Sequence, residues 1–466
     1  MGKSNKYWMS GRLSAISLTA AFSVLGLAPA MAQSDSGGIW QRSNLLGTIG
    51  GLRTVLGDYG VTLDINDSEN LLGNTLGGVK QGATMQGVTT GTLEIDTGKA
   101  FGLPGGTFHI SALQIHGQPL SGPYLDNLQA ANGNEAEDAT RLWEMWYDQA
   151  FDYGHADIKI GQQSIDNEFM VSQYSGLFVN TMAGWPLIPS DDLFGGGPAY
   201  PLSSLGARLQ FKLADNATIL GGVFDDNPGG GAFGDDAQFL DRNGALFNLN
   251  TGALFIAEFQ YAVNQPAVGD MVTTASPPSG LPGTYKIGFW YDTAFFPDQR
   301  LGTDGLSLAD PASNGNPEMH KGNYSIYGVM DQTVWQSAAD SARNLNIFAR
   351  IMGAPDNQNL IDFSFNGGVT LAAPLPGRDN DQLGIDFGLG KVSSRAAGLD
   401  RDEGITAQGT EELIEATYQA QATPWLILQP DFQYIVNPGA GVPDPNDPAH
   451  NLRNEFVAGI RVITTF

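Results

Sequence analysis

Apolar and polar residues alternate along most of this chain with a period of two. The last fourteen residues, 453–466, show the alternation most clearly. One face of an extended strand there would carry Phe456, Ala458, Ile460, Val462, Thr464 and Phe466, and the other Val457, Gly459 and Arg461. In water an apolar strand with a free edge invites aggregation, whereas a closed barrel in lipid has no edge and needs an apolar exterior. The pattern predicts the closing strand of a transmembrane β-barrel.

Sixteen segments with strand-like alternation follow one another along the chain. Their expected ranges are 60–68, 88–97, 106–116, 140–152, 155–164, 203–213, 217–225, 252–262, 284–294, 322–335, 344–353, 361–371, 381–392, 409–422, 425–436 and 453–466. Charged residues alternating with large apolar ones exclude a fully buried parallel sheet. The predicted fold is all-β, a transmembrane antiparallel β-barrel of sixteen strands over residues 59–466. A soluble antiparallel sandwich would alternate similarly and is the alternative.

The first 32 residues have the pattern of an export signal. Basic residues precede an apolar stretch over 13–27, and Ala30-Met31-Ala32 forms a small-x-small cleavage site. We therefore expect a signal peptide over 1–32, with an uncleaved anchor helix as the alternative. Residues 33–58 are expected to hold a short N-terminal helix, which would lie under the barrel or narrow the pore as a plug. Its helical spacing comes from Leu45, Leu46, Ile49, Leu52 and Leu56.

Composition narrows the possible functions. The chain has 49 acidic and 23 basic residues, a net charge of −26 that disfavours nucleic acid as a partner. It has no cysteine, and no H-E-x-x-H, G-x-S-x-G or Walker-type motif, so the sequence predicts neither an enzyme nor a cofactor. The acidic runs at 225–227, 235–236 and 444–447 offer oxygen ligands for Ca²⁺. They lack EF-hand spacing, and we interpret them as solvated loop tips, with no metal site predicted.

Four segments resemble the carbohydrate-selective porins of the OprB type. They are GQQSIDNEFMVSQYSGLFVNTMAGWP (161–186), GGGPAYPLSSLGARLQF (195–211), EELIEATYQAQATPWLILQPDFQYIVNPG (411–439) and GIRVITTF (459–466). Residues 40–63 also resemble the opening helix and first strand of that family. The resemblance implies a sixteen-stranded barrel in the outer membrane of a Gram-negative bacterium, which admits monosaccharides, polyols and related small polar solutes by facilitated diffusion. A non-selective or cation-biased general porin is the alternative.

Two further partners follow from this reading. A barrel of this kind contacts outer-membrane lipid with its apolar face. Its C-terminal strand, ending at Phe466, is expected to engage the barrel-assembly machinery.

Charged and aromatic residues on the inward phases are the candidate channel lining. Aromatic rings stack on pyranose faces, while carboxylates, Arg and amides bind hydroxyls. On 140–152 we expect Trp143, Met145 and Tyr147 to lie on the opposite, outward phase. The predicted lining is Glu144, Trp146, Asp148, Lys159, Arg208, Lys286, Trp290, Arg350, Glu411, Glu415, Asp431 and Arg461.

The segment 165–202 is too long for a periplasmic turn. Its prolines and aromatic residues indicate a stiff, partly apolar loop. We expect it to fold into the barrel and set the narrowest point of the pore, with a mobile extracellular loop as the alternative. The predicted constriction residues are Asn180, Trp185, Asp191, Asp192 and Tyr200.

Overall fold

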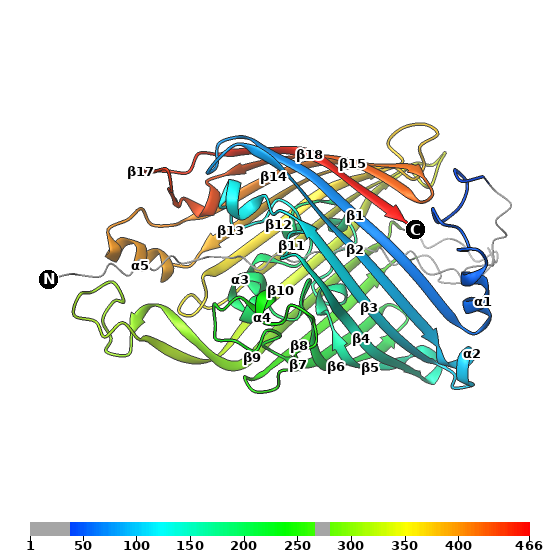
Figure 1. Cartoon of the computed structure of the whole chain (residues 1–466), viewed down its shortest axis with the longest axis horizontal. Helices are drawn as coiled ribbons and strands as arrows, with labels where there is room; N and C mark the ends of the chain where they lie inside the picture. The colour runs from blue at the N-terminus through cyan, green and yellow to red at the C-terminus, as the bar shows by residue number, and fades with distance from the viewer. Residues whose placement is uncertain (1–37, 266–279) are drawn as a thin grey trace.

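A closed antiparallel barrel of sixteen strands forms the body of the molecule (Figure 1). The computed structural model describes residues 38–265 and 280–466, so the predicted signal peptide lies outside the described residues. Each strand pairs with its neighbour along the chain, and β1 pairs with β18 to close the wall. Two facing sheets, as in a sandwich, are therefore excluded, and the predicted barrel is confirmed.

All sixteen predicted strands are present at the expected places. They are β1 (Val61–Leu76), β2 (Gly82–Asp96), β3 (Gly106–Gly117), β4 (Ala139–Phe151), β5 (Ala156–Gln163), β6 (Ser204–Ala214), β7 (Ala217–Asp225), β8 (Ala253–Val263), β9 (Gly283–Gly302), β10 (Pro317–Gln336), β11 (Asn344–Gly353), β12 (Ile361–Ala372), β13 (Gln382–Val392), β14 (Thr410–Thr423), β15 (Leu426–Val436) and β18 (Glu455–Thr465). The largest differences are the longer β1, β9 and β10. A small separate hairpin pairs β16 (Pro443–Asp444) with β17 (Asp447–Asn451).

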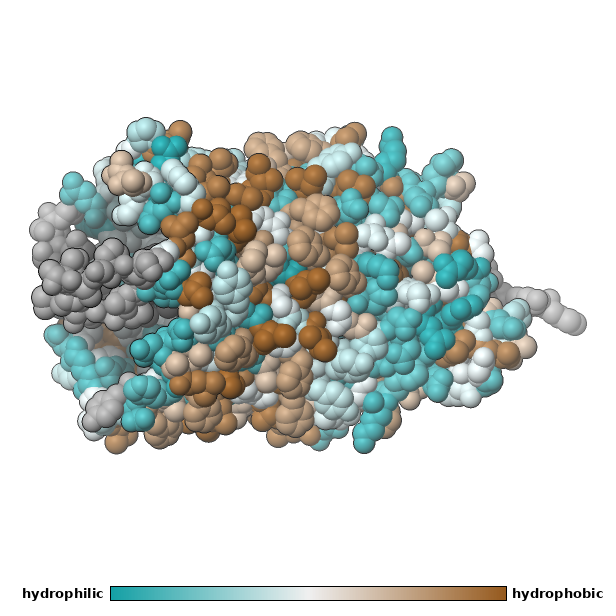
Figure 2. Space-filling model, turned by 180° about the vertical axis from the view of Figure 1, so that it is seen from behind, coloured by the Kyte–Doolittle hydropathy of each residue, from teal (hydrophilic) through white to brown (hydrophobic). Residues whose placement is uncertain are grey.

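The two faces of the wall differ as the alternation predicts. On β15, Phe432 is 49% exposed and Tyr434 38%, whereas Gln429, Asp431 and Gln433 on the other phase are fully buried. Figure 2 shows apolar residues gathered in a broad band across the barrel, with hydrophilic residues toward the ends. An apolar exterior and a polar interior are what a barrel surrounded by lipid requires.

The connections differ between the two ends of the barrel. At the end that carries α1 (Leu52–Asp58) and α2 (Thr97–Phe101), several turns are short, such as 215–216 and 424–425. The opposite end carries the long connections 118–138, 164–203 and 226–252, with α3 (Leu187–Asp192), α4 (Ala237–Leu240) and α5 (Ala396–Glu403). Long loops are extracellular in barrels of this type, which places α1 and the C-terminus on the periplasmic side.

Among the described residues, helices with the length and apolarity needed to cross a bilayer are not found.

The segment before β1 binds the end of the chain. Arg53 donates hydrogen bonds to the carbonyl oxygens of Phe466 and of Gly47 (2.6 Å for the latter). The indoles of Trp40 and Trp425 stack with ring centroids 6.1 Å apart. The helix is shorter than expected, because backbone with positive φ precedes it at Gly47, Ile49, Gly50 and Gly51. This segment lies against the periplasmic rim where β1 meets β18, rather than crossing the pore as a plug.

Candidate functional site

The long loop 164–203 lies inside the barrel and is held there by carboxylates of the wall. Glu415 on β14 accepts hydrogen bonds from the N–H groups of Val179 and Asn180 (2.6 and 3.0 Å). Further along the wall, Asp331 on β10 accepts from Gln173 N–H at 2.9 Å. Since a carboxylate that binds backbone N–H groups satisfies buried donors, each such residue fixes one point of the loop. Glu258 on β8 does the same for Met170 N–H (2.9 Å).

Cationic side chains of the wall hold the carbonyl groups of the same loop. Arg350 on β11 donates to the carbonyl oxygens of Met182 and Gly184, the latter at 2.6 Å. Arg461 on β18 donates to Val179 O (3.3 Å), and Lys286 on β9 donates to Val171 O (2.7 Å). Donors and acceptors of the loop backbone are thus both bound to the wall.

Glycines on the inward phase of β13 make room for the apolar side chains of the loop. A Cβ at Gly388 would collide with Met182 Sδ, and one at Gly390 would collide with Leu187. A Cβ at Gly384 would lie 2.7 Å from atoms of Leu177 and Phe178. The wall is therefore smooth where the loop docks, and we call Gly384, Gly388 and Gly390 the glycine track.

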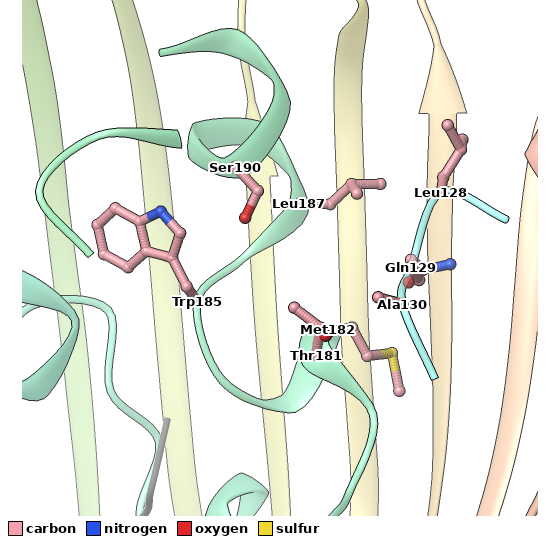
Figure 3. A pocket seen from close by; sticks show the side chains of 8 residues that line it. All are labelled: Leu128, Gln129, Ala130, Thr181, Met182, Trp185, Leu187 and Ser190. Carbon is pink, nitrogen blue, oxygen red and sulfur yellow. The ribbon is translucent and has the colours of Figure 1, made fainter. Parts of the chain in front are cut away.

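A second loop, 118–138, packs beside the first. Glu411 on β14 accepts hydrogen bonds from the N–H groups of Leu128 and Gln129 (both 2.8 Å). The two loops join where Thr181 N–H donates to Ala130 O at 2.9 Å. Figure 3 shows 128–130 and 181–190 facing each other in front of the wall strands, and the cavity between them is about 10 Å³. That space holds about one water molecule, so the two loops are packed together.

The predicted loop residues are mostly structural within this assembly. Asn180 donates its Nδ2 to Gln433 Oε1 (3.0 Å), and Trp185 is buried, with Nε1 bonded to Gly196 O (2.9 Å). Asp192 accepts from Leu360 N–H at 2.9 Å. Tyr200, also buried, bonds through its hydroxyl to Asn134 O (3.2 Å), and Asp191 lies half-buried in α3. The loop enters the barrel as expected; its role as the narrowest point stays a prediction.

Several residues that were predicted to line an open channel contact the backbone of loops 118–138 and 164–203 instead of water. Lys286, Arg350, Glu411, Glu415 and Arg461 point inward, as the alternation predicts, but they bind loop backbone rather than open water. Asp431 is fully buried and accepts from Gln433 Nε2 (2.8 Å). Trp290 is fully buried in the same apolar cluster as Trp185. Strand alternation gives the direction of a side chain, and it contains no information on which loop fills the space in front of it.

The other predicted residues meet on the inner wall of β3–β6. The imidazole of His109 stacks on Trp146 with centroids 4.5 Å apart, and Lys159 Nζ lies 4.2 Å from the indole centroid. His109 and Lys159 come from the strands on either side of β4, so the indole stands between them. We call Glu94, His109, Trp146, Asp148, Asp157, Lys159, Glu168 and Arg208 the lumen cluster.

Ion pairs connect the rest of the lumen cluster. Glu168, at the start of loop 164–203, pairs with Lys159 and with Arg208 Nε (2.6 Å). Arg208 also pairs with Asp148 (3.1 Å) and Asp157. Glu168 was not predicted because it lies in the loop after the strand 155–164, where no alternation indicates the direction of a side chain, and His109 is not among the predicted lining residues. Lys159 and Arg208 are thus both paired with carboxylates beside the Trp146 indole.

A β-bulge on β4 turns Trp143 to the opposite side of the strand from the one predicted. Ile110 pairs with Met145 but Ala112 pairs with Leu142, so two residues of β4 oppose one residue of β3. Trp143, expected on the outward phase, therefore points inward and packs edge-on against Tyr200 (centroids 6.1 Å apart). Glu144 also points inward, as predicted, and accepts from Ser164 N–H at 3.0 Å.

Two loop carboxyl groups should make docking of the loops dependent on pH. Burial raises the pKa of Asp166 to about 7 and that of Glu135 to about 7, from about 4 in water. An acid whose pKa is raised stabilises the docked state below pH ~4, and this stabilisation is lost as the pH rises to ~7. Single-channel conductance should therefore increase between pH 5 and pH 8. In the double variant D166N/E135Q, which cannot titrate there, conductance should be flat; an equal rise in that variant would assign the effect to other groups.

Comparison with known proteins gives the family. Residues 80–466 match the family model described as carbohydrate-selective porin, OprB family. Porin B of Pseudomonas aeruginosa is 24% identical over 453 residues, 91% of each chain. Putative porin QuiX of Acinetobacter baylyi is 24% identical over 457 residues, 91% of this chain and 93% of that protein.

The fold agrees with a solved structure. The high pH structure of Pseudomonas putida OprB aligns with a TM-score of 0.77 at 22% identity, covering 92% of this chain and 100% of that one. Because the family model spans most of the sequence, this protein belongs to the carbohydrate-selective porin, OprB family, and is a sugar channel of the Gram-negative outer membrane rather than an enzyme.

Proposed function

We propose that the channel admits monosaccharides and related small polar solutes, including polyols, by facilitated diffusion past the lumen cluster. The observation that carries this proposal is the network of ion pairs beside Trp146, with Lys159 over the indole and Arg208 paired with the carboxylates of Asp148 and Glu168. Hydroxyl groups of a sugar can both donate to the carboxylates and accept from the cations. A neutral polar solute therefore finds both hydrogen-bond donors and acceptors here, whereas a wall with charges of one sign would offer only one of the two.

The two loops that fold into the barrel, 118–138 and 164–203, leave only part of its interior for solutes, which supports the proposal of a narrow passage. They bind the wall from β8 through β12 to β18, and loop 118–138 also binds β1 through Asn134 and Ser68 (2.9 Å). We propose that the open route lies between loop 164–203 and β3–β6, with Asn180, Trp185, Asp191, Asp192 and Tyr200 forming the stiff part of its inner boundary. A non-selective or cation-biased porin is the competing function.

The lipid and assembly partners are also proposed. The exposed aromatic and aliphatic band supports contact with outer-membrane lipid. The C-terminal strand β18, together with Phe466 directly after it, is proposed to be the segment that the barrel-assembly machinery binds.

Selective permeation is tested by liposome swelling with glucose, arabinose, sucrose and neutral amino acids on the purified protein. Monosaccharides should enter faster than amino acids of the same size. Equal rates for solutes of equal size would contradict selectivity and favour the general porin.

The variant Lys159→Met removes one cation from the lumen cluster. We expect the affinity for glucose, measured by sugar block of the ion current, to fall about tenfold, because a hydrogen bond to a charged group contributes ~1.5–3 kcal/mol. Lys212→Met is the matched control, since it removes the same charge from an exposed position on β6. If salt conductance and sugar affinity fall in the same proportion, Lys159 only shapes the pore.

A further inference from the structure

The outer surface of β7–β10 carries an apolar groove, which we call the outer groove. It has a volume of about 600 Å³, and the side chains that line it include Phe259, Ile287, Phe289, Tyr291, Tyr324 and Ile326. These six residues belong to the exposed phase of β8, β9 and β10, and each is between 39% and 61% exposed. A volume of this size is typical of a site for an organic ligand and far exceeds the space of one water molecule.

Small residues on β7 and β8 hollow the wall at the outer groove. Ala257 on β8 lines the groove and pairs with Gly221 on β7. The pairs on the same face on either side of them are bulky and exposed: Ile219–Phe259 and Val223–Phe255. The groove therefore arises where a row of small side chains lies between two rows of large ones.

Polar groups stand at the extracellular end of the outer groove. Tyr291 on β9 pairs with Tyr324 on β10, and Lys321 lies three residues farther toward the extracellular side. Lys321 pairs with the exposed Phe295, so its side chain shares the outward face. A Cβ at Gly322 would collide with the hydroxyl of Tyr291, which places this hydroxyl beside the residue next to Lys321.

The charge of Lys321 has no counter-charge from the protein. Lys321 is exposed, and within residues 38–265 and 280–466 its Nζ forms neither an ion pair nor a hydrogen bond, unlike Lys159 and Lys286. Glu318, three residues away, groups with Asp298 and His320 instead. An unpaired cation at the edge of an apolar groove favours a ligand that has both an anionic head and an apolar chain.

The acidic groups of this sector are turned inward or buried. Glu258 and Asp292 lie on the inward phase of β8 and β9, with exposures of 1% and 0%. Asp225 and Asp226, which were predicted to form a solvated loop tip, are buried as well, so that prediction is wrong. None of these four carboxylates is exposed beside the outer groove, where it would repel an anionic ligand.

We propose that the outer groove binds one phosphorylated glycolipid of the outer leaflet, with an acyl chain in the groove and a phosphate at Lys321 and the Tyr291 hydroxyl. This inference rests on the proposed contact of the apolar band with lipid. The ammonium group and the hydroxyl donate to phosphate oxygens, and the apolar walls cover the chain. The outer leaflet supplies the lipid because Lys321 lies at the extracellular end of the groove.

The test measures binding of diphosphorylated lipid A to the purified full-length protein in detergent, by native mass spectrometry. The wild-type protein should retain one lipid A in preference to zwitterionic phosphatidylcholine. Lys321→Met should lower the affinity about tenfold, because a charged hydrogen bond to phosphate is lost. Ala257→Phe keeps Lys321 but fills the groove, and should also weaken binding. Lys391→Met is the matched control on β13, since Lys391 is exposed but already paired with Asp362 at 2.8 Å.

Three outcomes would overturn the proposal. One is equal affinity of the wild-type protein for lipid A and phosphatidylcholine, which would leave only general contact of the band with lipid. Another is an equal loss of affinity in K321M and K391M, which would indicate general attraction by surface charge. The third is wild-type affinity in A257F that is folded by heat-modifiable gel mobility.

Two measurements keep this inference separate from the proposed function. Glucose entry in the liposome-swelling assay should be the same in K321M as in the wild type, since Lys321 lies outside the channel. If instead the purified protein stays soluble without detergent, the proposed contact with lipid itself is wrong.

Discussion

Replacing Gly388 with phenylalanine should raise the single-channel conductance severalfold. A side chain at this point of the glycine track needs the space that Met182 fills, so loop 164–203 must move away from β13. The strand itself should tolerate the change, because position 388 points into the barrel and the lipid-facing residues are untouched. The measurement is conductance in planar bilayers, together with swelling by a disaccharide that the wild-type channel excludes.

Gly328→Phe is the control for the added volume on the other face of the wall. Gly328 lies on the lipid-facing phase of β10, and a Cβ there meets nothing closer than 3.7 Å, so the same change of volume should leave the loop in place. If G388F folds into a heat-modifiable barrel with unchanged conductance, loop 164–203 does not determine the width of the pore.

Loss of the Glu415 carboxylate should release the centre of the same loop. Glu415→Ala leaves the N–H groups of Val179 and Asn180 without their acceptor, at a cost of ~1–3 kcal/mol for each buried donor. We expect the folded variant to be cut by chymotrypsin near Phe178 and Trp185, where the wild-type protein resists. Conductance should increase in parallel.

Two further variants make the Glu415 experiment specific. Glu415→Gln keeps one carbonyl oxygen as acceptor, so its susceptibility should lie between those of the wild type and E415A. Glu412→Ala removes a carboxylate from the opposite phase of β14 and should behave as wild type. Equal cleavage of E412A and E415A would indicate general loosening of the barrel rather than loss of one anchor.

The strands were predictable because lipid and water impose a strict alternation on each of them. For β14 and β15 the inward residues Glu411, Glu415, Gln429 and Asp431 follow from that alternation alone. The bulge that turns Trp143 inward was not predictable, because Trp143-Glu144 carries no local signal that the pairing slips by one residue.

The partners of the inward residues depend on contacts between distant parts of the chain. Glu415 meets Val179 across 236 positions, and Arg350 meets Met182 across 168. The glycine track likewise appears in the sequence as small residues on β13, and only the docked loop shows why they are small. A sequence pattern describes each strand separately. The site is formed by contacts of loops 118–138 and 164–203 with strands that are distant from them in the sequence.

The bond between Arg53 and Phe466 has a consequence for the order of events during biogenesis. These residues lie 413 positions apart, so one is synthesised long before the other. Because β1 pairs with β18, the barrel cannot close until β18 has been delivered across the inner membrane. Until then β1 has no partner on one side, and the unfinished sheet must be sheltered from self-association during transit. Only then can Arg53, which precedes β1, bind the residue that follows β18.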